Sequence, residues 1–343
     1  MADSFIYDIL PHRFIPQHKL LLYYNDLIID ILKLADENNL TSIEMEIDNL
    51  PIIKEDKLID WLINNSYEEE AILISAKHLY FSLLRDFIFY MHESFSCAER
   101  GKVTVAYTVS RKPLKDNLLY FCWLLNDYKD FTNIVLHGKP SEMSISKLKP
   151  QEKIKILDDA SNTVEWYLNG EQLYELIYDR KTDISLTKIW DQSLHLITDS
   201  SHYPTKQGNI NFVFADDEIW NDYWQYYYVV IPYIMAFIIE VVMMIFERII
   251  GANENEIFIN KIIRLYKSSQ VFELIHPIIE IILEDEGIDK ILNKMTITCD
   301  NCSNIIKVKE YVYLKKELEN DYIYTCPHCK SQHLLGEYIF LEK

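Results

Sequence analysis

Glycine is scarce in this sequence, with only seven among 343 residues. Loops that hold phosphate groups through backbone amides usually need closely spaced glycines, and the chain contains neither a G-x-G-x-x-G motif nor a P-loop motif. These two nucleotide-binding motifs are therefore excluded. The charge, the apolar periodicity and the cysteine spacing are more informative than the glycines.

Positive charge is also in short supply. The 34 lysines and arginines are outnumbered by 53 aspartates and glutamates, which gives a formal net charge of -19. Such a charge repels nucleic acids and anionic membranes at long range unless a local basic patch overrides it. The composition therefore favours a protein partner or a homodimer, and RNA remains an alternative that needs a basic patch.

The N-terminal sequence MADSFIYDILPH lacks the basic start, apolar core and small-residue cleavage site of a signal peptide. A long apolar stretch, residues 226–250, reaches the length of a membrane-spanning helix, but it contains Pro232 and Glu240. A helix that is apolar on all sides also forms the buried centre of large helical domains. We expect a cytoplasmic protein without membrane contact, with this stretch in its core.

Apolar residues recur at spacings of three and four along most of the first 295 residues, which predicts a mainly α-helical domain. Gly101 is the expected end of one long helix, and Pro113 is expected to start or kink the next. The expected helices are 17–38, 52–64, 67–98, 101–127, 151–159, 170–198, 218–250, 255–267 and 271–294.

The character of the chain changes after Met295. From Thr296 onward, β-forming residues alternate with polar ones, which predicts strands at 305–314, 322–325 and 333–341. We therefore expect a large all-helical domain over residues 1–295 and a small β-rich module over residues 296–343.

Four cysteines of the β-rich module form two C-x2-C pairs separated by 23 residues: Cys299, Cys302, Cys326 and Cys329. Two residues between thiolates let one tight turn present both sulfurs to the same ion, and two such turns complete a tetrahedron around zinc. Because four ligands leave no open coordination position, we expect a structural Zn2+. Disulfides are the alternative, which a cytoplasmic location disfavours.

With these two turns among short strands, residues 296–343 resemble a zinc ribbon. Zinc ribbons serve either nucleic-acid binding or protein contact, so the resemblance leaves the function open. Tyr311 and Tyr313 lie among lysines and could stack on bases, but tyrosines on strands more often pack within the sheet.

The expected helix 67–98 contains an arginine and a histidine, Arg85 and His92, seven positions apart on one stripe. Together with Asp86 they resemble the R-x4-6-H signature of HEPN domains, all-helical modules of bacterial toxins and antiviral defence. The resemblance implies metal-independent RNA cleavage, in which the histidine transfers protons and the arginine stabilises charge on the phosphate. The alternative is that these residues form the solvated face of an amphipathic helix.

Two further segments, 110–125 and 194–204, resemble pieces of bacterial helical families grouped near HEPN and abortive-infection proteins. That resemblance makes Arg111, Asp116 and His202 a second set of candidate site residues, although each also fits an ordinary surface position. Arg13 and His18 have a similar spacing, but the prolines at 11 and 16 argue against a continuous helix that would hold both.

Two functional hypotheses follow. The first is a non-catalytic protein whose zinc ribbon and acidic surface bind other proteins, for example as a regulator in a bacterial defence or toxin system. The second is a HEPN-like ribonuclease toxin or effector that acts through Arg85 and His92. The acidic composition favours the first hypothesis, and the arginine–histidine pairs favour the second.

Overall fold

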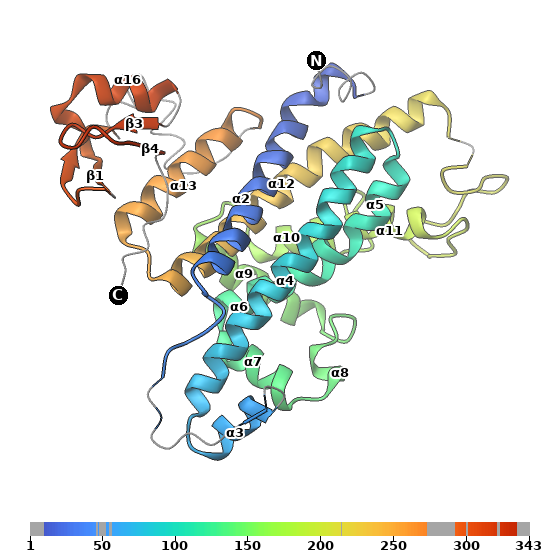
Figure 1. Cartoon of the computed structure of the whole chain (residues 1–343). Coiled ribbons are helices and arrows are strands. Elements are labelled where there is room, and N and C mark those ends of the chain that lie inside the picture. The colour runs from blue at the N-terminus through green and yellow to red at the C-terminus, as the bar shows by residue number, and fades with distance from the viewer. Residues whose placement is uncertain are drawn as a thin grey trace. The chain divides into compact units, whose positions relative to one another are not determined.

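The computed structural model describes residues 10–45, 47, 53–54, 57–213, 215–272, 292–299, 301–320 and 323–334. Within these residues the chain is mainly helical, and its strands form two small antiparallel pairs near the C-terminus (Figure 1). The predicted fold class, a large helical part followed by a small β-rich tail, is confirmed.

Contacts between residues divide the chain into two compact units, residues 1–245 and 246–343. Helix α13, Glu254–Ser269, therefore belongs to the same unit as the β-rich tail, whereas the sequence predicted a boundary near residue 295. A shared apolar core explains the grouping, because Ile259 of α13 packs in one cluster with Leu292, Ile297 and Ile306.

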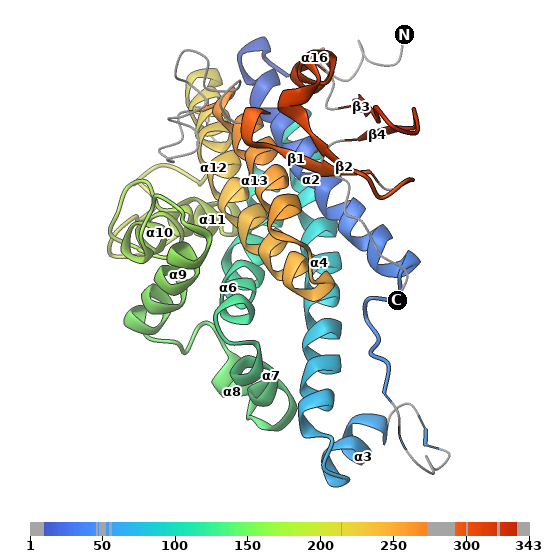
Figure 2. The ribbon, with the colours of Figure 1, turned by 90° about the vertical axis from the view of Figure 1, so that its left-hand side faces the viewer.

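The first unit is built from helices and short helical turns: η1 His12–Phe14, α2 Ile15–Glu37, α3 Leu58–Asn64, α4 Glu68–Glu99, α5 Val103–Lys112, η3 Pro113–Asn117, α6 Leu118–Asn126, α7 Tyr128–His137, α8 Pro140–Met143, α9 Pro150–Val164, α10 Gly170–Ile177, α11 Leu186–Leu194 and α12 Asp217–Ile250, which continues into the second unit. Figure 1 shows α4 running beside α2 and α5. Figure 2 shows α9, α10 and α11 grouped together on the same unit.

Helix α4 ends where the sequence predicted. Gly101 has a φ of +71°, a left-handed conformation that glycine adopts without the steric cost of a Cβ. The amide of Lys102 donates to the carbonyl of Cys97 at 2.9 Å, which satisfies one of the last carbonyls of the helix. The predicted distortion at Pro113 is also present, as the π-helical turn η3 between α5 and α6.

One predicted helix, 170–198, is wrong, because the structure breaks it into α10 and α11. Asp179 accepts hydrogen bonds from the amide and the hydroxyl of Thr182, at 3.1 and 2.5 Å, and so folds a turn. Ser185 then caps α11 by accepting a hydrogen bond from the amide of Thr187. Helices α7 and α8 were not predicted at all.

The apolar helix α12 is long and apolar enough to cross a membrane, but 83% of its most apolar window is buried in the protein. Buried hydrogen bonds connect α12 to α4, as expected of a helix in the core of the first unit. The buried hydroxyl of Tyr80 on α4 donates to the carbonyl of Val242 at 2.8 Å, and the hydroxyls of Tyr227 and Ser94 lie 2.7 Å apart.

The β-rich tail contains strands β1 Thr296–Thr298, β2 Ile305–Lys307, β3 Ile323–Thr325 and β4 Gln332–Leu334, a 3-10 turn η4 Val308–Glu310 and helix α16 Val312–Asn320. The strands pair as β1–β2 and β3–β4. The predicted strand 305–314 is wrong beyond Lys307, because its last residues begin a helix that buries Leu314. Most of the predicted helix 271–294 and most of the predicted strand 333–341 lie outside the described residues.

Candidate functional site

The four cysteines of the tail come together in two matching turns. Cys299 and Cys302 lie in the connection between β1 and β2, and Cys326 and Cys329 lie in the connection between β3 and β4. In each turn the backbone carbonyl of the first cysteine accepts a hydrogen bond from the residue that follows the second cysteine. The amide of Ser303 donates to the carbonyl of Cys299 at 2.7 Å, and the amide of Lys330 donates to the carbonyl of Cys326 at 3.0 Å.

Both turns also close in the same way. Ser303 and Lys330, the residues directly after the second cysteine of each pair, have positive φ values of 55° and 65°. This left-handed residue reverses the chain, so that both sulfurs of a pair face the same point.

The four cysteine sulfurs fit a tetrahedral metal site, since they all lie within 4.8 Å of one another. Cys299 and Cys329 are separated by 3.6 Å between sulfurs, and Cys302 and Cys326 by 3.8 Å. A tetrahedron with metal–sulfur bonds of about 2.3 Å has sulfur–sulfur edges of about 3.8 Å. These residues can therefore hold one metal ion, as the cysteine spacing predicted.

A second layer surrounds the sulfurs. The hydroxyl of Ser331 lies 2.8 Å from the sulfur of Cys329 and 2.6 Å from Nε2 of His333, and this imidazole nitrogen lies 3.3 Å from the sulfur of Cys299. Polar groups that contact ligand sulfurs tune metal affinity and orient the ligands. The sequence did not indicate Ser331. It placed His333 close enough to replace a cysteine but favoured a surface role for it, because four cysteines already complete the metal shell; His333 is in fact half-buried against Cys299.

The first set of predicted catalytic residues lies on α4 at the surface of the helical unit. Arg85 and His92 are both exposed, and Arg85 faces Asp36 of α2 across 3.7 Å. Asp86 is held by two residues of the following helices, Lys112 at 2.7 Å and Asn117 at 2.9 Å. Asp86 thus links α4 to α5 and η3 through its two polar contacts. Arg85 and His92 lie on the solvent-exposed face of α4, as the structural alternative for these two residues expects.

The second set has a different setting, because Arg111, Asp116 and His202 line one pocket of about 700 Å³. Residues of five helices and of the turn η3 line the pocket, together with a residue of the loop after α11. The helices are α5, α6, α9, α10 and α11. Its other polar lining residues include four cations and two tyrosines: Lys115, Lys153, Arg180, Lys181, Tyr174 and Tyr178.

The pocket is basic although the chain is strongly acidic. Five lysines and arginines line it against two aspartates, Asp116 and Asp179, and none of the five forms an ion pair with a carboxylate in the described part of the chain. Nε of Arg111 is buried without a hydrogen-bond partner among the described residues. The sequence missed Lys115, Lys153, Arg180 and Lys181 as site residues.

Burial changes the acidity of several pocket residues, among them Lys115, Asp116 and Lys153, and it lowers the pKa of Lys153. It lowers the pKa of Lys115 to about 8, with a further contribution from the neighbouring charge of Arg111. It also raises the pKa of Asp116, against the opposite effect of Arg111 and Lys115. An anion in the pocket would restore favourable interactions for the charged form of Lys115.

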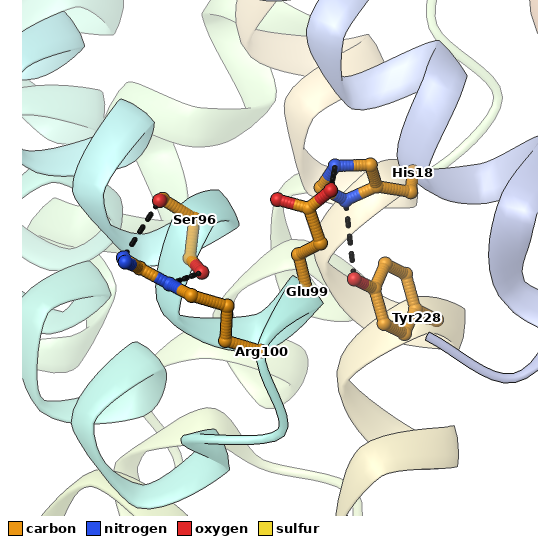
Figure 3. A network of polar contacts seen from close by, with 5 residues as sticks. All are labelled: His18, Ser96, Glu99, Arg100 and Tyr228. Atoms are coloured by element: carbon orange, nitrogen blue, oxygen red, sulfur yellow. Dashed lines mark hydrogen bonds and ion pairs between the residues drawn. The ribbon is translucent and has the colours of Figure 1, made fainter. Parts of the chain in front are cut away.

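A buried polar network connects α2, α4 and α12 (Figure 3). Nδ1 of His18 lies 3.1 Å from the hydroxyl of Tyr228, and its Nε2 lies 3.9 Å from a carboxylate oxygen of Glu99. Arg100 turns away from this group and donates to the carbonyl and hydroxyl of Ser96. Burial lowers the pKa of His18 to about 4, so the imidazole is neutral at pH 7.

Comparisons with protein-family models, with curated proteins and with solved structures found no significant match.

Proposed function

We propose that this chain is a protein-interaction or regulatory component, of the kind used in bacterial defence or toxin systems, whose C-terminal tail is a zinc ribbon that contacts a partner protein or a second copy of the chain. The cluster of four cysteine sulfurs carries the proposal. A closed shell of four thiolates leaves no coordination position for a substrate, so the Zn2+ has a structural role and fixes the shape of the tail.

Apolar side chains on the tail support protein contact. Ile305 on β2 is 68% exposed and Val312 at the start of α16 is 72% exposed, and Tyr313 beside it is also exposed. Apolar and aromatic side chains of this type are enriched at the centres of protein interfaces. The acidic chain disfavours nucleic acid as the partner, since it repels phosphates at long range.

The proposal is tested by affinity capture from the cells that produce the protein, together with sedimentation of the purified chain. A double variant, Ile305→Lys with Val312→Lys, should lose a specific partner or dissociate a dimer. Phe89→Lys on α4 is a matched control, because Phe89 is equally exposed at 65% but lies on the helical unit. Retention of every partner by the double variant, with a monomeric wild type, would refute the interaction role of these residues.

A metal-independent ribonuclease is the second candidate, and the pocket that contains Arg111, Asp116 and His202 favours it. In such a reaction a histidine accepts the proton of the RNA 2′-hydroxyl as the oxygen attacks the phosphate, and a protonated group donates to the leaving 5′-oxygen. Arg111 and Lys115 would stabilise the charge that develops on the phosphate.

Cleavage of labelled RNA by the purified chain, with a chelator added to the assay, tests this candidate. His202→Ala should reduce the rate by at least about 100-fold, the usual effect of removing a general acid or base. His92→Ala serves as the comparison, because it alters the exposed set on α4 without touching the pocket. If the wild-type chain leaves RNA intact, or both variants cleave equally well, the pocket is not a ribonuclease site.

A further inference from the structure

The pocket beside η3 has an excess of positive charge that the two aspartates of its lining offset only in part. Three of its cations, Arg111, Lys115 and Lys153, are half-buried, and two more, Arg180 and Lys181, lie exposed at its rim. In a chain with 53 acidic residues, a lining of five cations and two aspartates is unexpected on charge alone, and none of the five forms an ion pair in the described part of the chain. A ligand that brings negative charge would supply the missing partner.

We propose that this pocket binds a nucleoside phosphate, with the phosphate held by Arg111, Lys115 and Lys153 and the base lying against Tyr174. The inference goes beyond the proposed interaction role and does not require it. It shares residues with the ribonuclease candidate, but it needs only binding of a small ligand.

The phosphate end is defined by the half-buried cations. They come from three elements, α5, η3 and α9, and they line one pocket, in which Arg111 and Lys153 both act electrostatically on Lys115. The buried Nε of Arg111 has an unused donor, and charge-assisted hydrogen bonds from guanidinium groups to phosphate are among the strongest in proteins. The hydroxyls of Ser144 and Ser146, 2.9 Å apart on the same lining, add neutral donors.

The base end is defined by two stacked tyrosines. The rings of Tyr174 and Tyr178 have centroids 5.7 Å apart and planes inclined by 24°. Lys153 lies 5.1 Å from the centroid of Tyr178, and the Tyr178 hydroxyl is fixed by the carbonyl of Lys115 at 2.5 Å. Tyr178 is therefore held in the pocket lining by Lys153 and Lys115. Tyr174 is less buried and offers a flat ring, on which a base of any identity can stack.

Size and charge favour a single nucleotide over a polymer or a free phosphate ion. A volume of about 700 Å³ falls in the usual range for small-molecule sites, and it is much larger than one phosphate requires. A nucleic-acid strand would extend beyond the pocket and meet the field of a chain with net charge -19. A small ligand with a charge of about -2 is confined to the basic region.

Isothermal titration calorimetry of the whole 343-residue, metal-loaded chain with AMP, GMP, CMP and UMP tests the proposal, with adenosine and inorganic phosphate as partial ligands. At least one nucleotide should bind saturably, and both partial ligands should bind at least about tenfold more weakly. Lys153→Gln should weaken nucleotide binding by about ten- to a hundredfold, which is the loss of one charge-assisted hydrogen bond.

Two further variants keep the result interpretable. Arg180→Gln with Lys181→Gln changes only exposed side chains, so it should fold normally and weaken binding by a smaller factor. Lys129→Gln removes an equal charge outside the lining, where Lys129 pairs with Glu69, and should leave binding unchanged. No saturable binding of any of the four nucleotides, equal binding of adenosine, or equal loss in Lys129→Gln would overturn the proposal. Binding or cleavage of RNA without any mononucleotide binding would also overturn it, while supporting the ribonuclease candidate.

Discussion

The hydroxyl of Tyr228 on α12 lies 3.1 Å from Nδ1 of His18 on α2, and both side chains are buried. The contact joins two helices that are more than 200 positions apart in the sequence. Because burial lowers the pKa of His18 to about 4, the folded protein holds this imidazole neutral at a pH at which an unfolded chain would protonate it.

The stability of the helical unit should therefore fall in acid. An unfolded histidine takes up its proton near pH 6.5, whereas the pKa of folded His18 is about 4, so the stabilisation is complete above pH 6.5 and is lost as the pH falls toward 4. Between pH 7 and pH 5 this one group should cost about 2 kcal/mol of unfolding free energy. Burial raises the pKa of neighbouring Glu99 above 4.5, so the protonation of this carboxyl partly offsets the loss as the pH falls toward 4.5.

Urea denaturation at pH 7 and pH 5 measures the effect. His18→Gln should remove most of the His18 contribution to the difference between the two pH values, and His78→Gln, which alters an exposed histidine of α4, should leave the wild-type difference intact. An equal pH dependence in wild type and His18→Gln would show that this imidazole is not the titrating group.

Removal of one metal ligand should destroy the metal site and loosen the tail. Cys299→Ser eliminates one of four sulfurs that lie within 4.8 Å of one another, and the same cysteine belongs to the apolar cluster of the second unit. The wild-type chain should contain one zinc ion by elemental analysis, and the variant should contain well under one. A chelator should expose the tail to proteolysis in the wild type.

The matched control is Cys97→Ser, since Cys97 is a buried cysteine of α4 outside the cluster. It should retain a full metal content. A wild-type chain without bound metal would remove the basis for a zinc ribbon.

The metal cluster was predictable from sequence because C-x2-C spacing acts within a single turn. The long helices were predictable for a related reason, since α4 and α12 each carry an apolar pattern over many turns. The break between α10 and α11 was missed because it depends on short-range bonds of Asp179 and Ser185 rather than on periodicity.

The pocket was not predictable in the same way. Arg111, Lys153 and Arg180 lie in three separate segments. The packing of α6 against α9 and of α9 against α10 brings these segments together. The spacing of Arg85 and His92 correctly placed both on one helix, but it gave no information about Asp36 of α2, which faces Arg85. The spacing of residues along one helix shows which side chains share a face of that helix. Whether they form a functional site also depends on the residues that other helices place opposite that face.

If the pocket binds a nucleotide, its affinity should fall at alkaline pH. The pKa of Lys115 is lowered to about 8 by burial and by Arg111, with a smaller effect of Lys153 in the same direction and opposing effects of Asp191 and Asp116. Lys115 is therefore mostly charged at pH 7 and mostly neutral at pH 9. The phosphate of AMP is mostly doubly ionised at pH 7 and gains a little more negative charge by pH 9, so weaker binding at pH 9 reports on the protein.

Calorimetric titration with AMP at pH 7 and pH 9 should show up to about tenfold weaker binding at the higher pH. Lys115→Arg retains a charge that does not titrate in this range and should flatten the dependence. The same pH dependence in this variant would assign the titration to another group.

The hydrogen bonds of Ser94 should be among the most important polar contacts between α4, α5 and α12. Its buried hydroxyl donates to the carbonyl of Ala106 at 2.8 Å and lies 2.7 Å from the hydroxyl of Tyr227, which burial holds in its neutral form by raising its pKa. Ser94→Ala leaves the Tyr227 hydroxyl without this partner in an apolar environment, at a cost of about 1–3 kcal/mol.

Urea denaturation of Ser94→Ala should show this loss as a lower midpoint with an unchanged slope. The double variant Ser94→Ala with Tyr227→Phe should recover part of the stability, because it removes the unpaired hydroxyl as well. Ser82→Ala, at an exposed position of the same helix, should change stability by no more than about 0.5 kcal/mol. If Ser94→Ala matches Ser82→Ala, the buried hydroxyl pair does not contribute to holding α4 against α12.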